Sequence, residues 1–352
     1  MRADPFDPGA FKGRVDEALR GFVGREADEL VAIDAELVPV ARQLEEAVSE
    51  GKRLRAAFCY WGWRAAGQPD SDALLRAAAS MELVHAAAVV HDDLIDESAL
   101  RHGRPTAHIA LRARPRRRPR SATAARSLAM LVGDLLMALA GQLFATSGLP
   151  AAYLARARPL WSAMARELIA GECLEILRTG TAPDTESSLK VIRYKTAKYT
   201  VEQPLLIGGV LGGAGERLRA GFSAYGLPLG EAFQLRDDLL GLFGDPARTG
   251  KASPDDLRTA RPTALLAETW RVADESERAM LRRLLARGRA LDADGVDTVR
   301  ALMTRLGSPD RIERMITTRV AEATDALAGC AVPGTASAAL TALARSATVR
   351  QS

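Results

Sequence analysis

The chain is poor in cysteine, histidine and aromatic residues. Its 352 residues include 3 cysteines and 4 histidines, and aromatic side chains make up only 5% of the total. Cys59, Cys173 and Cys330 stand far apart and match neither a disulfide framework nor a zinc-ligand spacing. We therefore expect a fold that needs no cross-link or structural metal, cysteines that are small buried side chains, and a reducing, cytoplasmic location.

Export signals and membrane spans are also lacking in the sequence pattern. Residues 1–22 have no uninterrupted apolar core followed by a small-residue cleavage site. No apolar stretch approaches the length that a bilayer requires, so we expect no stable membrane insertion.

The net charge of +4 is modest and is unevenly distributed. The run RARPRRRPR at 112–120 accounts for it, and the rest of the chain is slightly negative. Nucleic-acid binding by the whole protein is therefore not expected. The run itself predicts a basic, flexible loop at 112–122, because like charges repel and proline disfavours helix. Contact with an anionic surface or a phosphate is the alternative for this loop.

Strand-like alternation of apolar and polar residues is scarce, whereas alanine, leucine, arginine and glutamate are abundant. Apolar residues recur at spacings of three and four, which predicts helices. The helical stretches are 71–97, 128–144, 153–177, 187–207, 215–243, 275–286 and 309–327. No repeat and no shift in composition marks a boundary, so residues 1–352 are predicted to form a single all-α domain.

The first motif with chemical content is His-Asp-Asp-Leu-Ile-Asp at 91–96. Asp92 and Asp96 are four residues apart and share one helix face, with Asp93 beside them. Carboxylates with room for water suit Mg²⁺, which keeps several waters and shares substrate phosphates. A solvated acidic helix end is the alternative.

A second acidic motif, Phe-Gln-Leu-Arg-Asp-Asp at 233–238, also ends an apolar helical stretch. Two such clusters facing each other across a cavity would hold Mg²⁺ ions around one diphosphate. Basic residues that suit phosphate recognition accompany them, although each one alone is more simply an exposed surface charge. They are Lys52, Arg55, Arg101, Arg104, Lys195 and Lys251.

Taken together, these segments resemble the trans-isoprenyl diphosphate synthase (polyprenyl synthetase) family from about residue 51 to residue 263. The motifs follow the family's order: GKRLR at 51–55, ELVHAAAVVHDDLID at 82–96, RHGRPT at 101–106, LVGDLL at 131–136, GECLEIL at 171–177, YKTAKYT at 194–200, FQLRDDLLGLFGD at 233–245 and TGK at 249–251. The resemblance implies a bundle of long helices around a deep central cavity. Proteins of this family are usually homodimers.

The resemblance also implies roles for individual residues. Three Mg²⁺ ions would be bound by Asp92, Asp93, Asp96, Asp237 and Asp238. The allylic diphosphate would be held by Arg101, Lys195 and Lys251, and isopentenyl diphosphate by Lys52, Arg55 and His85. Thr196 and Gln234 lie where the family steadies the developing allylic cation.

Two positions depart from the family pattern. Gly241 stands where a third aspartate is usual, and Asp256 downstream is a candidate replacement. His102 stands where a second arginine is usual in the isopentenyl site. Because histidine titrates near neutrality, this departure predicts weaker isopentenyl diphosphate binding above about pH 7 than below it.

The implied reaction is a head-to-tail condensation of isopentenyl diphosphate with dimethylallyl, geranyl or farnesyl diphosphate. Ala87 and Ala88 lie about one helical turn before Asp92, with Val84 and Met81 deeper along the helix. Small side chains there leave room for a growing chain, which favours geranylgeranyl diphosphate over farnesyl diphosphate.

Other functions stay open at this stage. They are a farnesyl or longer-chain synthase, a terpene cyclase, and a non-catalytic partner subunit. Lys52, Arg55 and His85 argue against a cyclase, which needs no isopentenyl site, whereas Gly241 is the best argument for a subunit. Glu82 and His85 also have the spacing of a di-iron ligand pair, but no second copy of that pair exists.

Overall fold

The computed structural model describes residues 7–113, 119–244 and 255–348. Its helices group into two compact units, which are described one at a time. The first unit contains Met1–Arg158 and Ile207–Ala214, and the second contains Pro159–Leu206 and Gly215–Ser352. Two of the three boundaries between them fall within helices, α7 (Ala151–Arg178) and α9 (Gln203–Leu211), and the third falls between Ala214 and Gly215, just before α10 (Glu216–Phe243). The prediction of a single domain stays a prediction.

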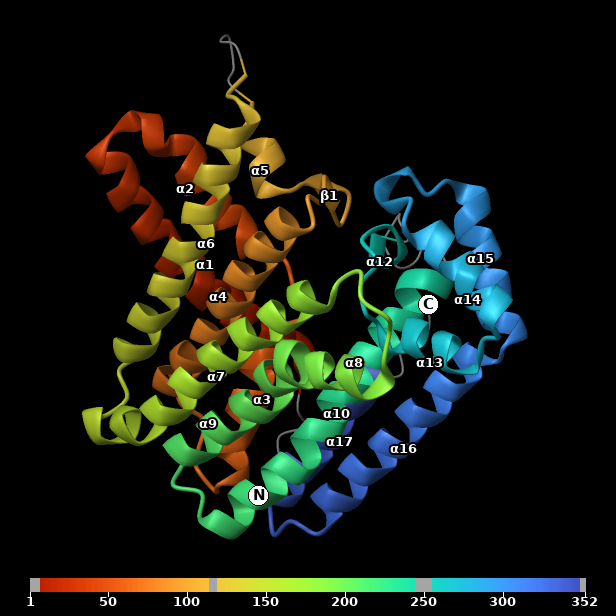
Figure 1. The fold of residues 1–352 in the computed structure, drawn as a ribbon. Coiled ribbons are helices and arrows are strands. Elements are labelled where there is room, and N and C mark those ends of the chain that lie inside the picture. Colours follow the sequence, from red (N-terminus) through yellow and green to blue (C-terminus); the bar gives the residue numbers. More distant parts are fainter. Residues whose placement is uncertain (1–6, 114–118, 245–254, 349–352) are drawn as a thin grey trace. The chain divides into compact units, whose positions relative to one another are not determined.

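The first unit is helical apart from one small hairpin (Figure 1). Besides parts of α7 and α9, it contains α1 (Pro8–Ile33), η1 (Ala35–Leu37), α2 (Val38–Ala47), α3 (Leu54–Ala65), α4 (Asp72–Ile95), β1 (Leu100–Arg101), β2 (Arg104–Pro105), α5 (Ala107–Ala110) and α6 (Ala122–Ala145). The strands β1 and β2 are the only ones within the described ranges, so the all-α prediction is confirmed.

Helix α4 is the central element of the first unit. Ser71 caps its first turn by accepting a hydrogen bond from the backbone N–H of Leu74. The helix is buried on most sides and packs along α6. Close approach is possible because α6 carries Gly133 opposite His91: a Cβ at Gly133 would lie 2.2 Å from the His91 ring. The acidic motif at the end of α4 is therefore fixed by a tightly packed helix pair.

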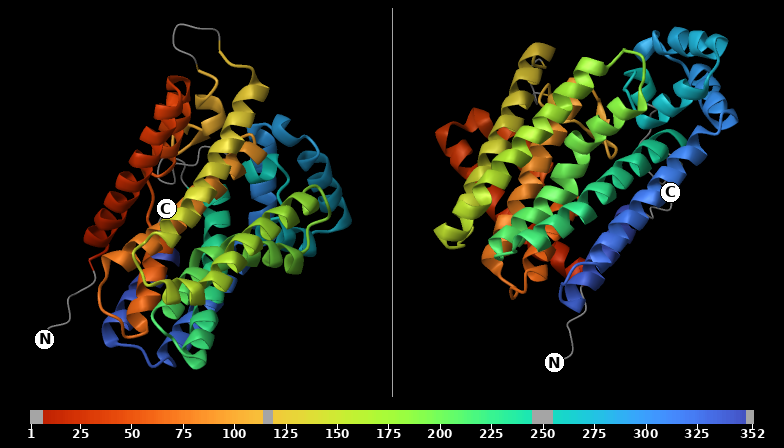
Figure 2. Two further views of the ribbon diagram at one scale, coloured as in Figure 1. Left: turned by 90° about the vertical axis from the view of Figure 1, so that its left-hand side faces the viewer. Right: turned by 60° about the horizontal axis from the view of Figure 1, so that its bottom comes forward.

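The second unit holds the rest of the chain. Besides the other parts of α7 and α9, its elements are α8 (Thr185–Ile192), η2 (Arg193–Glu202), α10 (Glu216–Phe243), α12 (Asp255–Arg258), α13 (Ala264–Val272), α14 (Glu275–Leu285), η3 (Gly288–Ala290), α15 (Ala293–Arg305), α16 (Ser308–Ala328) and α17 (Gly334–Thr348). Helix α10 runs beside α16 (Figure 2) and also packs against η2. Apolar residues of α10, α13, α15 and α16 form one buried core.

The predicted helix at 187–207 is helical throughout, but its middle is not an α-helix. Element η2 is a π-helix of 10 residues. π-Helical turns are rare and are often found at functional sites. This one lies between two close backbone contacts: a Cβ at Gly230 of α10 would lie 2.5 Å from the Cα of Ala197, and one at Gly171 of α7 would lie 2.3 Å from the backbone nitrogen of Lys195. Glycine at both positions lets the wide helix fit.

Two expectations from the sequence are wrong in part. Cys59 is buried, but Cys173 is exposed and Cys330 is half-buried, and all three are free thiols. By length and composition, α4 and α6 are apolar enough to cross a membrane, contrary to the expectation that no stretch qualifies. In α4, however, 72% of the apolar window is buried inside the structure, as in the core helix of a globular protein.

Candidate active site

The first acidic motif lies where α4 ends. Asp92 and Asp93 belong to the last turn, and Asp96 is the C-cap residue, whose backbone N–H donates to the carbonyl of Asp92. Asp93 is buried, with a relative exposure of 5%. Burial raises the pKa of its carboxyl, and the guanidinium of Arg101 opposes that effect.

Arg101 lies directly against this motif. Its Nε lies 2.9 Å and its Nη2 2.7 Å from Oδ1 of Asp93, and Nη2 also lies 3.3 Å from Oδ2 of Asp92. A small hairpin puts it there: Arg101 pairs with Arg104, and His102 and Gly103 form the two-residue turn, both with positive φ. Positive φ at both positions is typical of a type I′ turn.

The position of His102 follows from that turn. The residue stands at the exposed tip of the hairpin with a φ of 50°. The chain then returns to the end of α4 at Thr106, whose hydroxyl donates to the carbonyl of Ser98 over 2.6 Å. The hairpin is thus closed at its base, and Arg101 is held on the side of the acidic motif.

The basic motif at 51–55 leads into α3. Lys52 is exposed and Arg55 is buried. Between them, Arg53 adopts a left-handed conformation with a φ of 55°, and its Nε donates to Asp16 over 2.6 Å. That bond secures a backbone conformation that is unfavourable for a residue with a side chain.

His85 lies on α4, in the same electrostatic environment as these arginines. Burial lowers the pKa of the imidazole well below its usual value, and the positive charges of Arg55, Arg101 and Arg53 lower it further. One turn earlier, Glu82 accepts a hydrogen bond from the backbone N–H of Ala56 over 2.9 Å. The glutamate thus binds an N–H group of the first turn of α3, which otherwise has no partner within the helix.

The residues predicted to set product length lie along α4. Met81, Val84 and Ala87 are fully or almost fully buried, with exposures of 0%, 1% and 0%. Ala88 is only partly buried. Of the four, Ala88 is the most exposed.

In the second unit, the π-helix η2 carries Lys195 and Thr196 of the YKTAKYT motif. The Nζ of Lys195 lies 2.8 Å from Glu172 and also donates to Glu175, both on α7. These glutamates belong to the GECLEIL segment, but no role had been predicted for them. Their spacing of three residues on one helix face was the available signal.

Thr196 connects η2 with the second acidic motif. Its hydroxyl lies 2.9 Å from Oε1 of Gln234 on α10, and Nε2 of Gln234 lies 2.7 Å from Oδ1 of Asp238. The threonine donates to the amide oxygen, and the amide nitrogen donates to the carboxylate. The structure therefore brings together three of the predicted residues in one chain of hydrogen bonds.

Asp237 and Asp238 end the sequence motif, and Gly241 follows one turn later on α10. A Cβ built at Gly241 would lie 3.7 Å from Oδ2 of Asp256. Asp256 itself lies 3.4 Å from Nη1 of Arg261, whose Nε lies 3.8 Å from Glu175. Arg261 was not predicted as a site residue.

Lys251 falls outside the described residues, as does most of the basic run at 112–120.

The donor set of the second unit fits a divalent cation. Glu172, Glu175, Asp237, Asp238 and Asp256 are all oxygen donors, and Mg²⁺ binds oxygen ligands. Moreover, Oε1 of Glu172 is buried and has no hydrogen-bond partner among the described residues. A buried carboxylate oxygen without a donor is costly unless a cation or water satisfies it.

Comparison with known proteins agrees with this set of motifs. The polyprenyl synthetase family model matches residues 39–303. The chain belongs to the polyprenyl synthetase family.

Named members of the family are similar along most of the chain. A geranylgeranyl pyrophosphate synthase from Corynebacterium glutamicum, solved with isoprenyl diphosphate and magnesium, is 32% identical, with a TM-score of 0.92 over 98% of this chain and 100% of that one. The geranylfarnesyl diphosphate synthase of Aeropyrum pernix is 30% identical over 72% of this chain and 74% of its own length.

The (2E,6E)-farnesyl diphosphate synthase of Mycobacterium tuberculosis is 35% identical over 63% of this chain. The match spans only 57% of that protein's length. The products named for these relatives differ in chain length, so similarity does not decide the product of this family member.

Proposed function

We propose that this polyprenyl synthetase family member condenses isopentenyl diphosphate head to tail with an allylic diphosphate and releases diphosphate. The single observation that carries the proposal is the hydrogen-bonded chain Thr196–Gln234–Asp238, because it joins two of the family's motifs in one site. Arg55, which is buried, and His85, which is partly buried, support an isopentenyl diphosphate site in the first unit.

The predicted site residues have three separate roles in the proposed reaction. Arg101, Lys195 and Lys251 bind the allylic diphosphate, where positive charge stabilises the leaving group. Lys52, Arg55, His85 and His102 bind isopentenyl diphosphate. The amide oxygen of Gln234 and the hydroxyl oxygen of Thr196 stabilise the positive charge that develops on the carbon from which diphosphate departs.

Magnesium would be held by Asp92, Asp93 and Asp96 in one motif and by Asp237 and Asp238 in the other, as three ions. Bound there, it would neutralise the diphosphate and make it a better leaving group. The carboxylate of Asp93 also accepts hydrogen bonds from Arg101, which hold it in place. Asp256 supplements the second motif, where Gly241 carries no carboxylate.

Geranylgeranyl diphosphate is the proposed product. Small side chains at Ala87 and Ala88 lie one turn before the first motif, and Met81 and Val84 close the path further along α4. The buried state of Met81 and Val84 supports their place at the end of that path.

A homodimer in the cytoplasm is proposed as the working state. On α6, Met130 and Leu131 are 47% and 54% exposed, on a helix of high mean hydropathy. An apolar face on a long helix that already packs on α4 from its other side is suited to a second copy of the chain.

One assay tests the proposal against the two other functions. The purified chain is incubated with Mg²⁺, isopentenyl diphosphate and each allylic primer in turn, and the products are identified by mass. Elongated prenyl diphosphates are expected. A cyclic hydrocarbon formed without isopentenyl diphosphate would mean a terpene cyclase, and no product with any primer would mean a non-catalytic subunit.

A further inference from the structure

The second unit carries a positively charged hollow that none of the motifs above explains. It lies along α13 and α16 and is lined by Glu268, Arg311, Arg314, Met315, Thr318 and Arg319. The hollow has about 680 Å³ of empty space, part of it open to solvent. Every lining residue except Glu268 comes from one face of α16, at the spacings of three, four and seven that a helix requires.

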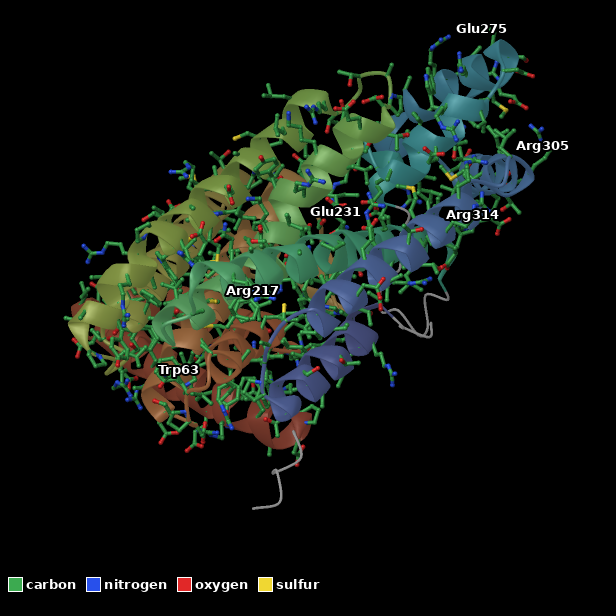
Figure 3. All side chains as sticks on the ribbon, turned by 90° about the horizontal axis from the view of Figure 1, so that it is seen from below. Trp63, Arg217, Glu231, Glu275, Arg305 and Arg314 are labelled. Carbon is green, nitrogen blue, oxygen red and sulfur yellow. The ribbon has the colours of Figure 1, made fainter. Side chains whose placement is uncertain are left out.

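Two buried glutamates anchor the arginines around this hollow. Glu231 of α10 binds Arg193 through one oxygen at 2.8 Å and Arg319 through the other at 2.7 Å. Glu268 of α13 binds Arg271 at 2.8 Å and Arg311 at 3.0 Å, both through Oε2. Figure 3 marks Glu231 on α10 and Arg314 on α16.

Each buried carboxylate is therefore shared by two guanidinium groups. Four arginines bind these two glutamates, and Arg314 lies beside them. The group of five arginines and two glutamates therefore has a net charge of three positive units. Such an excess favours a bound anion, because the arginines repel one another around an open hollow in which Arg314 and Thr318 are exposed to solvent.

The donors that remain unused define the chemistry of that anion. Arg311 is fully engaged by Glu268, Ser308 and the Leu306 carbonyl. Among the described residues, Arg319 in contrast has one partner, Glu231, which it contacts through its Nε. Neither the guanidinium of Arg314 nor the hydroxyl of Thr318 makes a hydrogen bond or ion pair to any other described residue.

Arg314 and Thr318 are one helical turn apart, and Arg319 follows directly. Together they offer two planar guanidinium forks and one hydroxyl to the same space. Arginine forks match the oxygens of phosphate groups in geometry and charge. We propose that this hollow is a binding site for a small phosphate-class oxyanion, of which inorganic diphosphate is the best fit to two forks.

The proposed site has a physical link to the catalytic motifs. Arg319 uses its Nε on Glu231, and Glu231 also holds Arg193 at the start of η2. Arg193 precedes Lys195 by two residues. The binding site itself does not depend on the proposed enzymatic reaction.

Isothermal titration of the full chain with inorganic diphosphate, in EDTA and without divalent cations, tests the inference. Wild type is expected to bind one diphosphate more per chain than Arg314→Glu. Thr318→Val, which is nearly isosteric, should bind at that site roughly tenfold more weakly, because one hydrogen bond to a charged group is lost. Titration with inorganic phosphate should show weaker binding at the same site.

Arg217→Glu is the matched control, since Arg217 is an exposed arginine of the same unit on α10 (Figure 3). It changes net charge by the same amount as Arg314→Glu and should keep the full stoichiometry. The proposal is overturned if Arg314→Glu and Thr318→Val titrate like wild type, or if Arg217→Glu loses as much binding. Should Arg314→Glu fail to fold, Thr318→Val alone decides the question.

Discussion

Thr196 and Gln234 stand 38 residues apart in the chain, and the hydroxyl of one donates to the amide oxygen of the other over 2.9 Å. Because the amide nitrogen of Gln234 is committed to Asp238, the amide group is held in one orientation. Its oxygen and the threonine oxygen form a small fixed region of negative potential, and this is what the proposed reaction needs beside a developing carbocation.

Replacing Thr196 by valine should therefore impair the chemical step more than binding. We expect kcat to fall roughly 10- to 100-fold, while KM for both diphosphates stays within about threefold. Steady-state kinetics with isopentenyl and geranyl diphosphate measure both constants. Thr324→Val, at an exposed threonine of α16, is the control and should behave as wild type. Equal losses in the two variants would contradict a specific role for Thr196.

Asp256 should contribute to metal binding in place of a carboxylate at position 241. Asp256→Asn is expected to raise the Mg²⁺ dissociation constant roughly tenfold, since one charged ligand is lost. Gly241→Asp in that background should restore much of the affinity, because a side chain at 241 enters the same space at ordinary contact distance. Calorimetric titration with Mg²⁺ gives the constants without any assay of activity.

Asp325→Asn, an exposed aspartate of α16, serves as the charge-matched control for that series. If Asp256→Asn and Asp325→Asn bind Mg²⁺ equally well, Asp256 is not a ligand.

Ala88→Phe should shorten the product. Ala88 is partly buried, so a phenyl ring can be accommodated while it blocks the path along α4. Chromatography and mass analysis of the prenyl alcohols after dephosphorylation should show a shift from geranylgeranyl toward farnesyl or geranyl products. Ala87→Phe is the comparison: Ala87 is fully buried, so overpacking should cost about 1–3 kcal/mol of stability instead. An unchanged product from Ala88→Phe would refute this assignment.

Leu131→Glu should weaken the proposed homodimer. A charge in the middle of an apolar interface loses its hydration without gaining a partner. Light scattering after size-exclusion chromatography is expected to show a shift from dimer to monomer at micromolar concentration. Ile33→Glu changes an apolar residue that is 75% exposed at the end of α1 and should leave the mass unchanged. A wild-type chain that is already monomeric would exclude the dimer.

Glu268 should make stability depend on pH in the acidic range. Burial acts to raise its pKa, but hydrogen bonds from Arg271, Thr185 and Arg311 prevail, so the pKa lies below its usual value of about 4.5. A carboxyl whose pKa is lowered by folding contributes its full stabilisation at a pH above its unfolded-state pKa. That contribution is lost as the pH falls through the folded-state pKa. Glu268→Gln should cost about 1–3 kcal/mol at pH 7 and progressively less below about pH 4.5.

Thermal unfolding of both proteins between pH 7 and pH 3 measures that difference. Glu275→Gln, which alters an exposed glutamate whose side chain is 74% exposed, should show almost none of it. A constant difference at all pH values would mean that the titration of Glu268 does not contribute.

Much of the helical pattern could be predicted from local sequence. Helices α4 and α10 begin and end within two residues of the predicted ranges, because each is long and has turn signals near its ends. Helix α3 was not predicted, although it runs from Leu54 to Ala65: it is apolar on nearly every face and so shows no amphipathic period. The π-helical form of η2 was also missed, since it depends on glycines in two other helices.

The candidate site divides in the same way. Linear motifs identified Asp92, Lys195 and Gln234, because carboxylates, cations and amides in a fixed order carry chemical meaning wherever the chain folds. The sequence did not predict a role for Arg261 or Glu175, because their relevance depends on an ion pair that forms only in the folded chain.

The sequence by itself determined the all-α class, the family and the acidic motifs, since periodicity and motif spacing are local properties of the chain. Only the tertiary structure decided which donor meets which acceptor: Thr196 with Gln234, Arg101 with Asp93, and Glu231 between two arginines. Hydrogen bonds and ion pairs act over a few ångströms, and distances that short between residues tens of positions apart arise only when helices pack.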